Sequence, residues 1–361
     1  MLRRIVVSCA TLVALLSMSA GGLARAAPAP AAGVRGVWIH AGLFGKEETA
    51  ALAKMRATLD EYRHAGITAV FCFSGLPDEH GFGWDLLGAL VREAHARGVQ
   101  VHLVLSPGYT VSLEGEVKQH PEWLITGTKG EIYPHLNLSH PGARQYFLTR
   151  VAAALKYDLD GIHLDYTRFP LGQSFSYDRP TIEAFKAEFG ESPLDVSRDA
   201  GNMIWCEWVG WNARQVTTLV RQVREAVRRH STRLVLSAAV FPNAALAAYE
   251  IGQDWETWAR EGLVDILCPM LYTNNRALFR QYVKRAVSIA SGRCRVYAGI
   301  ACVSSHNRNT PAGVSEEASI AAEEGADGIV LFSGYSLDRS FLDVLAGTQA
   351  GRGGRDGGDR R

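Results

Sequence analysis

The run DGIHLDYTRFP, residues 160–170, joins a short apolar stretch to a group of polar and aromatic residues. Side chains alternate between the two faces of a strand, so Gly161, His163 and Asp165 are expected to share one face. A parallel strand that is buried on both faces reads as an almost continuous apolar run, which is how this stretch begins. We therefore predict a buried strand that presents Asp165 near its carboxyl end.

Eight runs of this kind follow one another along the chain. They cover residues 34–42, 67–74, 99–109, 161–170, 233–242, 264–273, 295–303 and 328–337. Longer stretches with helical spacing separate them, and several of these stop at a Gly, which enters the left-handed conformation without strain. Eight strand–helix units without a linker predict a single (β/α)8 TIM barrel over residues 27–346.

An open, doubly wound sheet is the alternative architecture. It is expected to carry a Gly-rich nucleotide-binding turn after its first strand, and AGLFG at residues 41–45 lacks that fingerprint. Within the predicted barrel, the connections after strands three and four are long, at residues 110–145 and 171–200. Long ordered loops of this kind often carry function.

The two ends of the chain are expected to lie outside the barrel. Arg3 and Arg4 precede an apolar run that is too short for a stable membrane span, and Ala24-Arg25-Ala26 has the small-x-small pattern of a cleavage site. We predict a secretory signal peptide over residues 1–26 and a secreted or periplasmic protein without stable membrane insertion. Residues 347–361 are predicted to form a disordered Gly/Arg/Asp tail.

The charge balance is close to neutral. The 361 residues include 38 Lys and Arg against 37 Asp and Glu, and the predicted signal peptide removes three Arg and no acidic residue. A nucleic-acid partner requires a basic surface, so none is expected. The five Cys that remain after cleavage form no Cys-x-x-Cys or Cys/His ligand spacing. We predict no metal and no cofactor, and an uncharged ligand suits this composition.

Two carboxyl groups are the leading catalytic candidates, Asp165 and Asp254. A buried carboxylate needs a partner, and Arg168 is predicted to pair with Asp165 and to hold it ionised. An Asp–Arg pair that only pins a loop is the alternative. Asp254 follows the fifth strand, at the expected start of a helix, where its alternative role is an N-cap. Asp78 and Glu79, in the loop after the second strand, are further candidates for the second carboxyl group.

Aromatic and polar side chains gather at or near the predicted strand ends. Aromatic rings stack on the apolar C–H faces of sugars, while polar side chains bind the hydroxyl groups. The predicted binding residues are Trp38, His40, His102, Tyr109, Asn137, His163, Tyr166, Arg168 and Tyr272. For His102 and His163, a hydrogen-bonded position in the core is the alternative. A metal site of His40, both of these His and Asp165 is less favoured, because the first strand lacks a His-x-His pattern.

Several motifs, in order along the chain, resemble the glycosyl hydrolase-like family 10 barrel. They are RGVW (35–38), EAHARGVQVH (93–102), HPEWL (120–124), LNLSHP (136–141), DGIHLDYTRFP (160–170), QDW (253–255), PMLY (269–272) and GIVLF (328–332). The resemblance covers most of residues 34–345. It implies an exported bacterial (β/α)8 glycoside hydrolase that acts on cell-wall or surface glycans.

The chain departs from the family pattern at a few positions. Leu138 and Leu86 stand where members usually or often carry Pro, which indicates local backbone changes. Chitinase-type barrels have a catalytic Glu where this chain has Thr167, so a mechanism that relies on that acid is not expected.

The resemblance implies chemistry that usually needs two carboxyl groups flanking the scissile bond. Asp165 is assigned the role of nucleophile or charge stabiliser, and Asp254 that of the second group. The expected partner is an oligosaccharide or polysaccharide substrate. A glycan-binding barrel without catalysis is the main alternative, and a metal-dependent hydrolase is a less favoured one.

Overall fold

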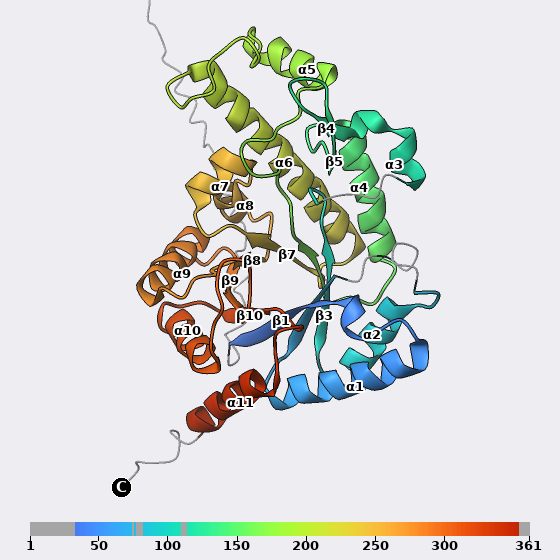
Figure 1. The fold of residues 1–361 in the computed structure, drawn as a ribbon, viewed down its shortest axis with the longest axis vertical. Coiled ribbons are helices and arrows are strands. Elements are labelled where there is room, and N and C mark those ends of the chain that lie inside the picture. The colour runs from blue at the N-terminus through green and yellow to red at the C-terminus, as the bar shows by residue number, and fades with distance from the viewer. Residues whose placement is uncertain (1–32, 74–75, 77–81, 110–113, 354–361) are drawn as a thin grey trace, which may run out of the picture. The chain divides into compact units, whose positions relative to one another are not determined.

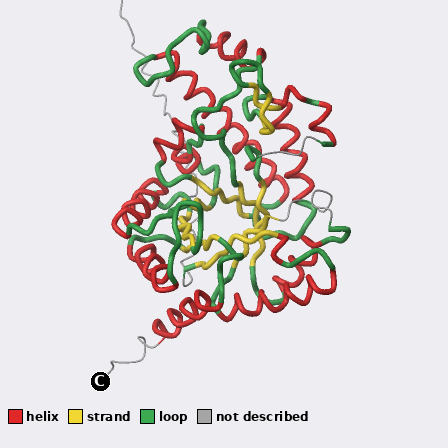
Figure 2. Tube along the Cα trace, viewed as in Figure 1, coloured by secondary structure: helices red, strands yellow, loops and turns green. Residues whose placement is uncertain are grey.

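Eight parallel strands close into a barrel in the computed structural model, which describes residues 33–73, 76, 82–109 and 114–353. The order around the barrel is β1-β10-β9-β8-β7-β6-β3-β2. The strands are β1 (Val34–His40), β2 (Ala69–Phe73), β3 (Gln100–Leu105), β6 (Gly161–Leu164), β7 (Val235–Val240), β8 (Ile266–Pro269), β9 (Arg295–Ala301) and β10 (Gly328–Phe332). Figure 2 shows the strands as a ring enclosed by helices. The predicted single (β/α)8 barrel is confirmed.

Helices cover the outside of the ring. They are α1 (Glu48–His64), α2 (Leu86–His95), α4 (Pro141–Ala154), α6 (Met203–His230), α7 (Ala244–Ile251), α8 (Trp255–Arg260), α9 (Arg276–Ala290), α10 (Pro311–Glu323) and α11 (Arg339–Gly353). Several of these helices have a short polar side chain at the N-cap, which accepts a hydrogen bond from a backbone N–H group of the first turn. Asn202, for example, accepts from the Trp205 amide at the start of α6.

Each of the long connections carries elements of its own. The loop after β3 contains α3 (Gly115–Gln119), the 3-10 turn η2 (Pro121–Trp123) and the antiparallel pair β4 (Leu124–Thr126) and β5 (Ile132–Leu136). The loop after β6 contains α5 (Arg179–Phe189). Figure 1 shows these elements together on one side of the barrel, beside α4 and α6. The long loops expected after the third and fourth strands are therefore present.

The fourth barrel strand is shorter than predicted. β6 ends at Leu164, and Tyr166 takes a positive φ of 47°, which no extended strand can accommodate. The backbone turns there, because Arg168 N–H donates to the Tyr166 carbonyl at 2.8 Å. Aromatic residues after the strand have strand propensity, but they belong to the turn at the barrel mouth. Asp165 thus follows the strand directly.

The last helix extends past the predicted start of the C-terminal tail. α11 continues to Gly353, whereas the tail was expected from residue 347. Buried Phe341, Leu342 and Leu345 anchor the first turns of this helix, and an anchored helix extends through residues that composition alone assigns to a tail. Residues 354–361 and the predicted signal peptide lie outside the described residues. In the part of the chain that is described, no helix combines the length and apolar character needed to cross a bilayer.

Gly161 allows the inside of the barrel to close around His102. A Cβ atom at this position would clash with the His102 ring and would lie 2.6 Å from the Val235 carbonyl oxygen. The His102 ring stacks on Phe71, with ring centroids 4.7 Å apart. Close packing of this kind leaves no room for an added methyl group.

We predict that Gly161→Ala lowers the free energy of unfolding by about 1–3 kcal/mol, because overpacking displaces strand backbone. Gly210→Ala is the matched control: it lies within α6, and its nearest neighbouring atom would be 3.8 Å from an added Cβ. That change is expected to be neutral or slightly stabilising. Denaturant unfolding of both variants measures the difference, and equal stabilities would contradict the packing argument.

Candidate active site at the barrel mouth

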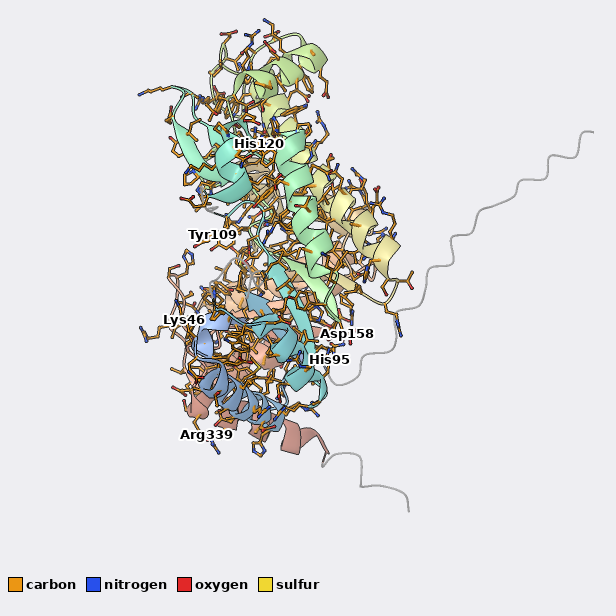
Figure 3. All side chains as sticks on the ribbon, turned by 90° about the vertical axis from the view of Figure 1, so that its right-hand side faces the viewer. Lys46, His95, Tyr109, His120, Asp158 and Arg339 are labelled. Atoms are coloured by element: carbon orange, nitrogen blue, oxygen red, sulfur yellow. The ribbon has the colours of Figure 1, made fainter. Side chains whose placement is uncertain are left out.

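A pocket of about 690 Å³ opens at the carboxyl ends of the barrel strands. Its lining includes Trp38, Phe73, Asp165, Tyr166, Arg168, Phe241, Met270, Tyr272, Ser304, Ser305, His306 and Phe332. Figure 3 shows which end of the barrel this is: Tyr109 and Lys46, which follow β3 and β1, lie at one end, while His95 and Asp158 lie at the other. The pocket therefore sits where α/β barrels carry their catalytic groups.

Asp165 enters this pocket directly from β6. Its carboxylate accepts a hydrogen bond of 2.7 Å from the Tyr166 amide, and its side chain is almost fully buried. Burial raises the pKa of Asp165 to about 6, an effect that the hydrogen bond and the positive charge of Arg168 only partly offset. Loss of water disfavours the charged form of a carboxyl group. Asp165 is therefore a carboxyl group that takes up a proton near pH 6, well above the range of a free Asp side chain.

The predicted ion pair between Arg168 and Asp165 is wrong. The Arg168 guanidinium lies over the rings of Tyr166 and Phe241, 4.5 and 4.8 Å from their centroids, and forms no ion pair with Asp165 among the described side chains. Its Nε has no hydrogen-bond partner in the described part of the chain. Arg168 therefore gives the pocket wall a positive charge but does not hold Asp165 ionised.

The turn after Asp165 is held in a strained conformation. Tyr166 lies in the left-handed region that non-Gly residues rarely adopt. Its carbonyl accepts hydrogen bonds from the Gly108 and Arg168 amides at 2.9 and 2.8 Å. A side chain at Gly108 would clash with the backbone oxygens of Tyr166 and Arg168. Such strain persists where neighbouring structure over-determines it, and it clusters at functional sites.

His163 supports the pocket from below. Its Nε2 accepts a hydrogen bond of 3.1 Å from Trp38 Nε1, and its Nδ1 lies 2.8 Å from Ser237 Oγ. Since Nε2 accepts, Nδ1 carries the hydrogen of the neutral ring and donates it to Ser237. Burial lowers the pKa of His163 well below its ordinary value, and nearby His102 adds to this effect. Neutral His163 thus positions Trp38, which lines the pocket.

The structure brings only some of the predicted binding residues to the pocket. Trp38, Tyr166, Arg168 and Tyr272 line it, and the Tyr109 ring contacts that of Tyr166 in a tilted arrangement, with 4.6 Å between ring centroids. His102 and His163 are core residues within the barrel, and burial lowers the pKa of His102 to about 4. His40 lines an adjoining hollow. The expected hydrogen-bonded position in the core is found for His163, whereas His102 Nδ1 has no hydrogen-bond partner among the described residues.

Asn137 lies away from the pocket. Its side-chain amide donates to Asp178 and Thr181, at 2.9 and 3.0 Å, and so joins the end of β5 to the start of α5. Thr167, at the position of the chitinase acid, is fully buried and does not line the pocket either. Asn137 therefore holds the two long loops together. It is not among the described residues that line the pocket, where it was predicted to bind a ligand.

Asp254 caps a helix. Its carboxylate accepts a hydrogen bond of 3.1 Å from the Thr257 amide at the start of α8, and it is absent from the described lining of the pocket. The alternative role as an N-cap is the one that the structure shows, since the strand-end rule locates a loop but not the direction of its side chains. Asp78 and Glu79 lie outside the described residues. Asp165 is the only carboxyl group among the described lining residues.

Some lining residues went unpredicted. Phe241 and Phe332 stand at the ends of the fifth and eighth predicted strands, so the strand-end rule could have found them. Ser304, Ser305 and His306 come from the loop after β9, where no spacing in the sequence signals a site. Among the described residues, no group of three His, Cys, Asp or Glu could hold a metal ion.

A closed (β/α)8 barrel with a buried carboxyl group and aromatic walls at its mouth is compatible with a glycoside hydrolase. The chain belongs to the glycosyl hydrolase-like 10 family, whose model matches residues 76–311. It is 24% identical over 257 residues to glycosyl hydrolase DigH of Escherichia coli O6:H1. The aligned region covers 61% of this chain and 54% of that protein. The chain thus spans about half the length of this relative.

Solved structures share the fold. The glycoside hydrolase domain of PgaB from Bordetella bronchiseptica superposes with a TM-score of 0.69 at 14% identity, covering 87% of this chain and 98% of that domain. A beta-galactosidase from Marinomonas ef1 gives a TM-score of 0.66 at 12% identity, covering 88% and 59%. Family membership places the chain among glycosyl hydrolase-like proteins, and these neighbours show that the barrel fold is shared.

The burial of Asp165 predicts a pH-dependent difference in stability. Its pKa is about 6 in the folded protein against 3.8 for the free group, so ionisation destabilises the fold as pH rises through this window and costs nothing below it. Asp165→Asn removes the charge. We expect its Tm to match that of the wild type near pH 3.5 and to exceed it at pH 7, by an amount equivalent to roughly 1–3 kcal/mol.

Asp254→Asn is the matched control for this measurement, because the helix cap is not buried in the pocket. Its Tm difference from the wild type measures the effect of losing the α8 cap alone. If the Tm difference between Asp165→Asn and the wild type stayed constant from pH 4 to pH 7, Asp165 would not be desolvated in the folded protein.

Proposed function

We propose that this protein is a glycoside hydrolase that cleaves O-glycosidic bonds in a bacterial cell-wall or surface polysaccharide, with Asp165 as its essential carboxyl group. The observation that carries the proposal is the position of this carboxyl group, desolvated at the end of β6 in an aromatic pocket. The similarity to glycosyl hydrolase DigH and to the PgaB glycoside hydrolase domain supports the same class of reaction.

The pocket walls suit a neutral sugar ring. Tyr166 and Tyr272 offer aromatic surface for sugar C–H groups, while Trp38 lines the pocket but is almost fully buried. Burial, followed by the nearby Asp165, raises the pKa of Tyr272 well above its ordinary value, so its hydroxyl remains a hydrogen-bond donor. Arg168 adds N–H donors for sugar oxygens. Aromatic faces with a few polar groups are typical of a specific small-ligand site.

The pKa of Asp165 favours a role as proton donor. A catalytic acid works best when its pKa lies near the working pH, and glycosidase acids have raised pKa values. Asp165, with a pKa of about 6, meets this condition. Burial disfavours the ionised form that a nucleophile or charge stabiliser uses, and the charge of Arg168 offsets this effect only in part. We therefore assign Asp165 to protonation of the leaving-group oxygen.

A second carboxyl group is the usual requirement of this chemistry. Asp254 is engaged at the α8 cap, which leaves Asp78 and Glu79 as the candidates from the sequence. Substitution of each by its amide tests them. Loss of activity in one variant identifies the group, whereas full activity in both favours an exception to the two-carboxyl rule, in which the substrate supplies the second group.

A glycan-binding barrel without catalysis is the second candidate function. One observation favours it: among the described residues that line the pocket, Asp165 is the only one with a carboxyl group. Product analysis after long incubation, together with direct binding measurements on the same glycan, separates the two functions. Binding without released reducing ends would establish the second.

We also propose export from the cytoplasm, on the pattern of residues 1–26. Expression of the full chain with a C-terminal tag, followed by cell fractionation and N-terminal sequencing, tests this. A mature chain that begins at Ala27 in an extracytoplasmic fraction is expected. Recovery of the uncleaved chain from the cytoplasm alone would contradict it.

Asp165→Asn is predicted to lower kcat/KM by about 10²–10⁴-fold, the range of a lost general acid. The assay follows reducing ends released from a panel of purified peptidoglycan, N-acetylglucosamine polymers and galactans. For the wild type, kcat/KM should fall as pH rises above about 6, because Asp165 then loses its proton.

The control for this prediction is Asp254→Asn, which is expected to retain activity because its carboxylate caps α8. Circular dichroism on both variants checks that the barrel is folded. Wild-type rates in folded Asp165→Asn would remove Asp165 from the mechanism.

A further inference from the structure

A second hollow, of about 470 Å³, adjoins the Asp165 pocket at the barrel mouth. It lies over β1 and β10, and its lining includes His40, Gly42, Phe73, Phe82, Phe332 and Tyr335. Phe73 and Phe332 line both cavities, so these two rings form the boundary between them. A molecule that fills the Asp165 pocket can therefore continue into the second hollow across a single aromatic ridge.

The walls of this hollow are aromatic. The His40 ring stacks on Phe73, with 4.6 Å between centroids and 12° between planes, and faces Tyr335 at 6.0 Å. Tyr335 is 60% exposed, although a large aromatic ring gains by burial. An exposed aromatic ring beside a catalytic pocket provides a free face on which a ligand can stack.

Gly42 keeps this hollow open. A Cβ atom at this position would lie 3.0 Å from the Tyr335 hydroxyl oxygen, so a side chain would crowd Tyr335 and enter the hollow. Gly42 is not held in the left-handed region, so no backbone strain demands glycine here. The described lining of the hollow contains no Asp, Glu, Lys or Arg. An uncharged ring fits these walls better than a charged group.

We propose that this hollow is a second sugar-binding subsite, which holds a neutral pyranose ring of the same glycan chain whose neighbouring ring occupies the Asp165 pocket. The inference rests on the proposed function and deepens it. Tyr335 stacks on the ring, and the chain crosses the ridge of Phe73 and Phe332. The protein then prefers oligosaccharides long enough to fill both cavities.

Binding of defined oligosaccharides tests the subsite. The probes are linear N-acetylglucosamine oligomers and galactose oligomers of two to six rings, titrated by calorimetry into the full chain carrying Asp165→Asn, so that hydrolysis does not interfere. We expect at least one series to bind with a step in affinity when the oligomer becomes long enough to enter the second hollow. A stacked ring corresponds to a step of roughly threefold to tenfold.

Two variants and one control locate this step. Tyr335→Ala removes the stacking face and Gly42→Leu fills the hollow, and both are expected to reduce or abolish the step in affinity. Tyr133→Ala is the matched control, because Tyr133 is also an exposed aromatic residue but lies on β5, outside both linings. It should leave the step unchanged. Because the two test variants act by opposite steric changes, a folding defect in one does not remove the test.

The outcomes separate this inference from the proposed function. A step that survives in folded Tyr335→Ala and Gly42→Leu overturns the subsite, whether or not the wild type cleaves glycans. Absence of binding for both series at every length overturns it as well. Hydrolysis is scored independently on the wild type: binding with a step that these variants abolish, but without cleavage, supports the subsite and rejects the hydrolase.

Discussion

Asp165 passes from β6 straight into a pocket walled by Trp38, Tyr166 and Tyr272, and the free energy of its ionisation is set there by loss of water. Its single backbone hydrogen bond and the charge of Arg168 are too weak to restore the usual acidity. The chemistry proposed for this protein depends on that balance, because a carboxyl group with a raised pKa keeps a proton that it can donate up to a higher pH.

The inside of the barrel maintains this environment. His163 accepts from Trp38 and donates to Ser237, which links β1, β6 and β7 beneath the pocket. Gly161 leaves space for the His102 ring beside them. Buried neutral imidazoles that satisfy neighbouring donors and acceptors stabilise a unique packing arrangement. His163 therefore acts on a ligand only indirectly, through the position of the aromatic wall, whereas His102 Nδ1 has no hydrogen-bond partner among the described residues.

The mouth of the barrel has more binding surface than one sugar ring needs. The Asp165 pocket and the hollow over β1 and β10 meet at Phe73 and Phe332, and Tyr109 extends the aromatic surface beyond Tyr166. A surface of successive aromatic faces suits a polymer, since each face contributes a similar stacking energy. This arrangement agrees with family membership and with the polysaccharide substrate that we propose.

The sequence by itself determined the eight strand–helix units, the closed barrel and the position of Asp165 at the end of the fourth strand, because apolar periodicity and Gly stops are local properties of the chain. Tertiary structure alone decided which side chains meet. Arg168, three residues from Asp165, stacks on Phe241 instead, and Asp254 turns to a helix end. Trp38 and His163 are 125 residues apart yet share a hydrogen bond. Closure of the barrel sets such contacts, and they set the burial on which the acidity of Asp165 depends.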